Sequence, residues 1–118
     1  MSIILTDLQP LYRGDSRDYN INVIKSNGVP EPITGWKFYF TAKLNYHDDD
    51  ENAAIKKDIT SHIDPEGGKT IIALTHDDTD IDPEIYWYDI QAKRADGSII
   101  TLARGRLEIT LDITRRVD

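Results

Sequence analysis

Apolar and polar residues alternate along much of this chain, and the alternation predicts β-strands. The clearest run covers residues 36–44, where even positions are aromatic or aliphatic and odd positions are lysine, tyrosine or threonine. Successive side chains of a strand point to opposite faces, so a period of two predicts a half-buried strand with its even positions in the core. A shorter run of the same kind predicts a strand over residues 19–23.

Residues 85–112 predict a long hairpin with an Asp-Gly pair, residues 96–97, at its turn. Asp-Gly favours the positive φ angles of a type I′ turn, whose two-residue loop would set Arg94 opposite Ile99. A slip of one residue would exchange the two faces of each strand. We therefore expect the register of this hairpin to be well specified.

This register makes specific cross-strand predictions. One face pairs large residues with small ones, and the other carries an ionic and a cation–π contact. The predicted pairs are Tyr86–Leu107, Tyr88–Gly105, Ile90–Ala103 and Ala92–Thr101 on the first face, and Asp89–Arg104 and Trp87–Arg106 on the second. Odd positions from 99 to 113 keep one apolar phase, which is long for a strand, so we expect a bend near Gly105.

Shorter apolar runs at residues 3–6, 54–59 and 70–75 predict further strands. The acidic stretch 45–52 predicts a solvated loop, and residues 76–83 suit a single helical turn. Seven short strands separated by turn signals point to one domain, residues 1–118, with an all-β fold. The expected architecture is an immunoglobulin-like antiparallel β-sandwich of about seven strands.

Composition narrows the function classes. The 118 residues include no cysteine, which excludes disulfides and thiolate metal sites, and the formal net charge of −7 disfavours nucleic acid as a partner. The apolar runs are too short to cross a membrane. The N-terminus lacks the pattern of a secretory signal.

Two short motifs resemble known binding motifs. Arg13-Gly14-Asp15 is the tripeptide that integrins read, but its position predicts an ordinary turn. Asp78, Asp80 and Asp82 imitate the spacing of a calcium loop, although Pro83 replaces the glycine that such a loop requires. The alternative is that Asp77, Asp78 and Asp80 cap and solubilise a turn.

The chain offers no constellation for catalysis. His47, His62 and His76 lack metal-ligand spacing, and no nucleophile elbow or phosphate loop is present. We expect no enzyme activity, no cofactor and no small-molecule substrate.

Several short motifs occur in a characteristic order along nearly the whole chain. They are Arg13-Gly14-Asp15-Ser16, Ile33-Thr34-Gly35-Trp36, Asp64-Pro65 with Gly67-Gly68-Lys69, Tyr86-Trp87-Tyr88-Asp89-Ile90-Gln91, Asp96-Gly97 and Ile109-Thr110-Leu111-Asp112-Ile113-Thr114-Arg115. In this order the chain resembles a family of small bacteriophage structural proteins, in particular the immunoglobulin-like N-terminal domain of upper baseplate proteins and related prophage tail proteins. The resemblance implies a non-enzymatic virion component, made in the bacterial cytoplasm and built into the particle in several copies.

If the strand at 36–44 lies beside the hairpin, one sheet face gathers aromatic, aliphatic and arginine side chains. We predict that this face binds partners, because interfaces favour such residues. The predicted partner-binding residues are Tyr39, Trp87, Ile100, Leu102, Arg104 and Arg106, with Lys43 and Lys93 at the rim. On this interpretation, replacement of Trp87 and Leu102 by serine preserves the fold. The alternative is that the N-terminal strand or the acidic loop covers the face.

Two functions therefore stay open. The first is a phage virion structural protein of the tail, baseplate or neck, which assembles with copies of itself and with other virion proteins. The alternative is a carbohydrate- or host-surface-binding module in which loop aromatics and carboxylates hold a ligand, with or without Ca²⁺.

Overall fold

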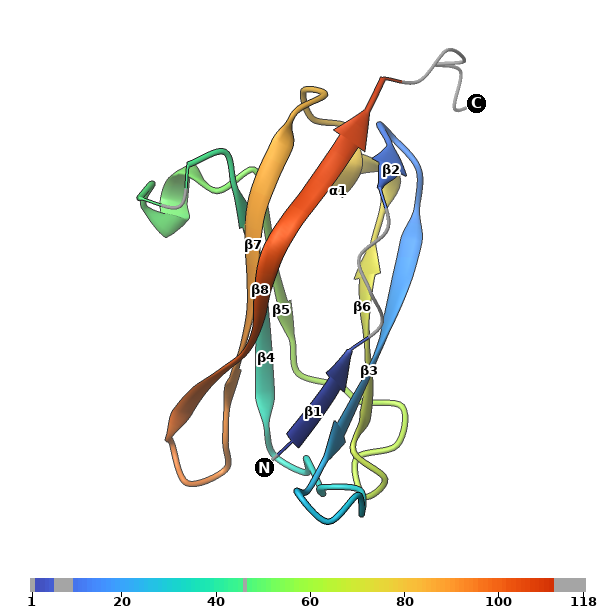
Figure 1. The fold of residues 1–118 in the computed structure, drawn as a ribbon, viewed down its shortest axis with the longest axis vertical. Helices are drawn as coiled ribbons and strands as arrows, with labels where there is room; N and C mark the ends of the chain where they lie inside the picture. Colours follow the sequence, from blue (N-terminus) through green and yellow to red (C-terminus); the bar gives the residue numbers. More distant parts are fainter. Residues whose placement is uncertain (1, 6–9, 46, 112–118) are drawn as a thin grey trace.

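Two β-sheets face each other in the computed structural model, which describes residues 2–5, 10–45 and 47–111 (Figure 1). One sheet has the order β1-β3-β6 and the other the order β2-β8-β7-β4-β5. The strands are β1 (Ser2–Leu5), β2 (Leu11–Tyr12), β3 (Arg17–Ile24), β4 (Lys37–Lys43), β5 (Ile55–Ile59), β6 (Lys69–Leu74), β7 (Ile85–Lys93) and β8 (Ile99–Thr110). The only helical elements in these ranges are η1 (Asp50–Asn52) and α1 (His76–Thr79).

The prediction of an all-β sandwich is confirmed. All seven predicted strands are present, and the additional strand, β2, has two residues and runs parallel to β8. Every other strand pair is antiparallel. Thr6 and residues 112–115, which the sequence analysis placed in the first strand, the last strand and the final motif, lie outside the described ranges.

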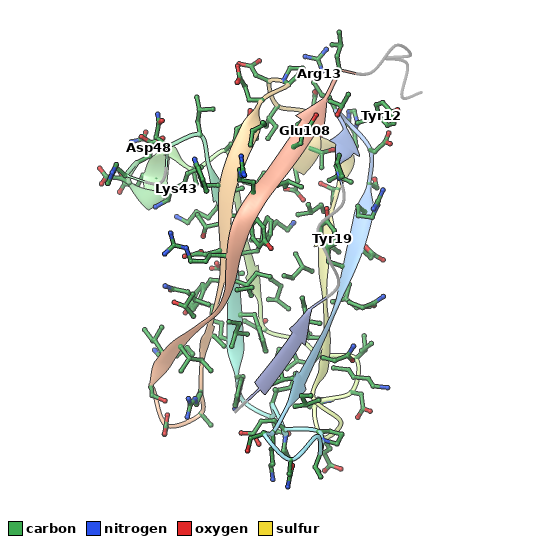
Figure 2. All side chains as sticks on the ribbon, in the orientation of Figure 1. Tyr12, Arg13, Tyr19, Lys43, Asp48 and Glu108 are labelled. Atoms are coloured by element: carbon green, nitrogen blue, oxygen red, sulfur yellow. The ribbon has the colours of Figure 1, made fainter. Side chains whose placement is uncertain are left out.

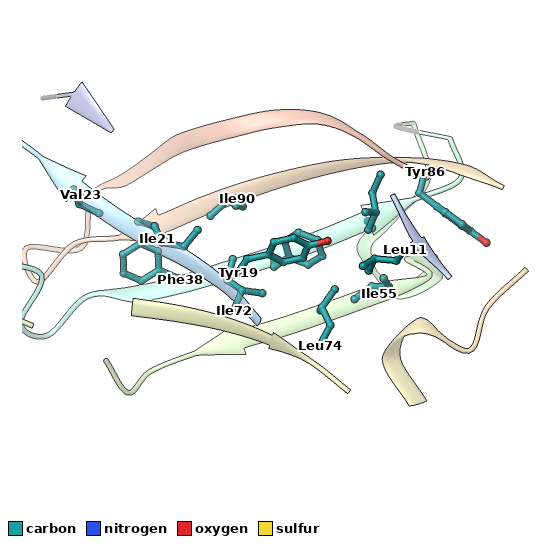
Figure 3. Packing of buried hydrophobic residues seen from close by; sticks show 14 of the residues in the cluster. Leu11, Tyr19, Ile21, Val23, Phe38, Ile55, Ile72, Leu74, Tyr86 and Ile90 are labelled. Carbon is teal, nitrogen blue, oxygen red and sulfur yellow. The ribbon is translucent and has the colours of Figure 1, made fainter. Parts of the chain in front are cut away.

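The core lies between the two sheets (Figure 3). The even positions of β4 carry it as predicted, since Phe38, Phe40 and Ala42 are fully buried. The prediction is wrong for Leu44, which is 47% exposed because β4 ends one residue earlier, at Lys43. The opposite sheet contributes the inward positions of β3, including Tyr19.

The hairpin of β7 and β8 has the predicted register over most of its length. Five pairs are confirmed, from Tyr86–Leu107 to Ile90–Ala103. The predicted type I′ turn is wrong, because among the described residues only glycines have positive φ, so Asp96 does not. Gly97 has a φ of 90° and donates to the carbonyl of Arg94 at 2.9 Å. The amide of Arg94 in turn donates to the Ser98 carbonyl, which defines a three-residue loop.

An odd loop would shift the whole register by one residue, but a β-bulge cancels the shift. Gln91 faces Thr101 while Ile90 faces Ala103, so Leu102 is the extra residue of β8. The predicted pairs Arg94–Ile99 and Ala92–Thr101 are therefore wrong, and Ile100 lies opposite Ala92. The register shift lies at Leu102, and β8 continues through Gly105, where the expected bend stays a prediction.

Candidate functional site

The outward face of the five-stranded sheet holds a groove of about 670 Å³. Strands β5, β4, β7 and β8 line it, and the antiparallel register arranges its side chains in rows across the sheet. Read from β4 through β7 to β8, the rows are Lys43–Trp87–Arg106, Thr41–Asp89–Arg104, Tyr39–Gln91–Thr101 and Lys37–Lys93–Ile99.

Both aromatic side chains of this face carry a cation over the ring. The guanidinium carbon of Arg106 lies 5.6 Å from the ring centroid of Trp87, which confirms the predicted cation–π contact. The ammonium of Lys37 lies 5.0 Å from the centroid of Tyr39 and 3.7 Å from the carboxylate of Asp58. Trp87 nevertheless keeps 38% of its surface exposed.

The face is strongly basic in a chain whose formal net charge is −7. Six basic side chains oppose three carboxylates, Asp58, Asp89 and Glu108. The basic residues are Lys37, Lys43, Lys56, Lys93, Arg104 and Arg106. Arg104 lies opposite Asp89 as predicted.

The structure brings together four of the six predicted partner-binding residues. Tyr39, Trp87 and Arg104 line the groove and Arg106 covers Trp87. The placement of Ile100 and Leu102 on this face was wrong, because both pack against the core. The bulge exchanges the faces of β8 between Leu102 and the turn, so Ile99 and Thr101 replace them. The Asp-Gly pair could have indicated the three-residue loop. It is also compatible with loops of this length in which glycine is the third residue.

Among the described residues, neither the N-terminal strand nor the acidic loop lines the groove. Strand β1 pairs with β3 in the other sheet, so the N-terminal strand does not lie over this face. None of the described residues between β4 and β5 lines the groove. Figure 2 places Lys43 and Asp48 at the same end of the molecule as Tyr12 and Arg13.

The Arg13-Gly14-Asp15 segment is a turn, as predicted. Gly14 has a φ of 85°, and its amide donates to the carbonyl of Thr79 at 3.2 Å. His76 donates from Nδ1 to the Gly14 carbonyl, and the Thr79 hydroxyl donates to the Asp15 carbonyl, each at 2.8 Å. Helix α1 thus holds the backbone of this tripeptide in place.

Asp78 caps α1, which confirms the capping interpretation for this residue. Its carboxylate accepts from the Thr75 amide at 2.8 Å and pairs with Lys57 Nζ at 3.0 Å. Burial acts to raise the pKa of Asp78, but the hydrogen bonds from Thr75 and Lys57 outweigh it and hold the pKa below 3.8. The ion pair also joins β5 of one sheet to the segment that follows β6 of the other.

Other chemistry is limited in the described part of the chain. No group of three or more His, Cys, Asp or Glu side chains is placed there to hold a metal ion. His62 hydrogen-bonds the Trp36 carbonyl and the Thr70 hydroxyl, both at 2.8 Å. Neither helical element in that part is long and apolar enough to cross a membrane.

No protein-family model matches this chain, and no curated protein matches it. The function is therefore argued from the fold and the groove.

Proposed function

We propose that this protein is a structural component of a bacteriophage virion, in the tail, baseplate or neck, with an immunoglobulin-like sandwich as its building block. The groove on the five-stranded sheet is the surface that docks other virion proteins or copies of the same chain. The observation that carries this proposal is the gathering of Trp87, Tyr39 and two arginines on one accessible sheet face. Aromatic residues and arginine are enriched at the energetic centres of protein interfaces.

Two features of the fold support the immunoglobulin-like part of the proposal. The strand orders correspond to A-B-E in one sheet and A′-G-F-C-C′ in the other. Tyr86, at the start of β7, donates its hydroxyl to the carbonyl of Asp82 at 2.6 Å. Immunoglobulin-like sandwiches often have such a tyrosine near the start of strand F, which is β7 here. Its hydroxyl donates to a backbone carbonyl a few residues earlier in the chain.

The second candidate is a carbohydrate-binding module that uses the same groove. Trp87, Tyr39, Gln91 and Asp89 supply the rings, amide and carboxylate with which proteins hold sugars. Arg106 and Lys37, however, lie over the two rings and compete with a sugar for their faces. This competition makes assembly the stronger proposal.

The test is to look for the protein in purified particles. Phage induced from the source bacterium would be banded by density and digested for mass spectrometry, with an abundant host cytoplasmic protein as control. We expect peptides of this chain to co-purify with the particles while the host protein is depleted. Recovery of the chain only from the soluble lysate would overturn the proposal. Calorimetry against a glycan panel, with and without Ca²⁺, would then test the second candidate.

A further inference from the structure

The basic groove and an acidic end of the same molecule are complementary in charge, and from this we infer that the chain associates head to tail. In this arrangement the acidic end of one copy docks in the groove of the next. The inference deepens the proposed function, on which it rests, by naming a second copy as the occupant of the groove.

The acidic end is formed by α1 and the turn before β7 in the upper part of Figure 1, and η1 projects beside the five-stranded sheet on the left. Residues 49–52 and 76–84 present exposed carboxylates and contain no lysine or arginine, while Arg13 of the neighbouring turn lies at the same end. The carboxylates are Asp49, Glu51, Asp77, Asp82 and Glu84. Asp78 is excluded from this set, because its carboxylate pairs with Lys57 inside the molecule.

The groove offers cations to which such a surface can bind. Within the described ranges, Lys56, Lys93 and Arg104 form no ion pair. Since Lys37 and Arg106 occupy the aromatic faces, the groove is suited to carboxylates with apolar contact to Trp87 and Ile99 rather than to a stacked sugar.

A molecule cannot fill its own groove in this way. Glu84 immediately precedes β7 and Lys93 ends it, and a nine-residue strand separates them by about 30 Å. The acidic end can therefore reach the far end of a groove only on another copy. Because the two surfaces are different patches, the contact is heterologous and generates rings or open arrays.

The experiment measures mass by sedimentation velocity over a range of protein concentrations at about 0.05 M and about 0.5 M salt. We expect concentration-dependent association that weakens at the higher salt. The groove variant Lys93→Gln/Arg104→Gln and the end variant Asp77→Asn/Glu84→Gln should each associate about tenfold more weakly, the effect of losing two exposed ion pairs.

Matched controls carry the same charge changes elsewhere. Lys25→Gln/Lys69→Gln and Asp18→Asn/Glu66→Gln alter exposed residues outside both surfaces and should associate as the parent does. Circular dichroism verifies that each variant is folded. Equal weakening in a control would show a general charge effect and would overturn the inference.

A mixture of the two variants gives the sharpest test. The end variant keeps an intact groove and the groove variant keeps an intact acidic end, so the mixture should form a 1:1 dimer that grows no further. A mixture that associates no better than its components would overturn the head-to-tail contact. If the parent stays monomeric but is found in purified particles, this inference fails and the proposed virion role stands.

Discussion

The ring of Tyr88 occupies the space above Gly105: a Cβ at residue 105 would lie 3.1 Å from Tyr88 Cε1. The same ring stacks on Phe40 of the next strand, with centroids 5.8 Å apart. Tyr88 therefore covers a weak position of β8 and joins three strands of the sheet.

We expect Gly105→Ala to lower the free energy of unfolding by about 1 kcal/mol, because the ring must move away from Phe40 to admit the methyl group. The measurement is urea denaturation followed by Trp fluorescence. In a Tyr88→Ala background the same change should be neutral or stabilising, since the ring is gone and alanine suits a strand better than glycine. Equal destabilisation in both backgrounds would contradict the packing explanation.

Tyr86→Phe removes the hydroxyl that donates to the Asp82 carbonyl at 2.6 Å. The loss of this hydrogen bond should lower the free energy of unfolding by about 1–2 kcal/mol. Burial raises the pKa of Tyr86, with the charges of Asp82 and Glu84 adding to the effect. A variant as stable as the parent would show that the hydrogen bond from Tyr86 to Asp82 does not contribute to the free energy of unfolding.

Tyr19→Phe is the matched comparison for Tyr86→Phe. Unlike Tyr86→Phe, it should not lower the free energy of unfolding. The Tyr19 hydroxyl is buried without a hydrogen-bond partner among the described residues, and burial raises its pKa. Removal of this group should leave the free energy of unfolding unchanged or raise it by about 1 kcal/mol. A clear loss in the same urea titration would mean that the hydroxyl has a partner in solution.

Stability should fall in acid partly through Asp78. Its pKa in the folded protein lies below 3.8, so the unfolded chain takes up the proton first as the pH falls. The stabilisation is present above pH 3.8 and is lost as the pH drops through the folded pKa. Asp78→Asn should cost about 1 kcal/mol at pH 7 and flatten the acid limb of a plot of melting temperature against pH. Asp77→Asn, one residue away and exposed, is the control and should keep the steep limb.

Serine replacements distinguish the two faces of the β7–β8 hairpin. Trp87→Ser should change the free energy of unfolding by less than about 1 kcal/mol, because the ring lies on the outer face. Leu102→Ser should cost about 2 kcal/mol, because this side chain packs against the core. If both replacements changed the free energy of unfolding equally little, Leu102 would lie on the groove face, as the sequence predicted.

The sequence alone determined the strands and most of the hairpin register. Alternation at residues 36–44 places Phe38 and Phe40 inside, because an apolar stripe with period two can be buried only by a strand. Tyr88 and Gly105 could be paired in advance, since a slip of one residue would break the large-against-small pairing.

The tertiary structure decided the composition of the groove and the position of the acidic segments. Asp-Gly accommodates either of two loops, and the choice of the three-residue loop with a bulge at Leu102 depends on which face of β8 the opposite sheet can cover. The contact between α1 and the Gly14 turn joins residues 62 positions apart, which no local pattern specifies. Local propensity acts over a few residues, whereas the separation of a basic face from an acidic end arises only when distant strands pair.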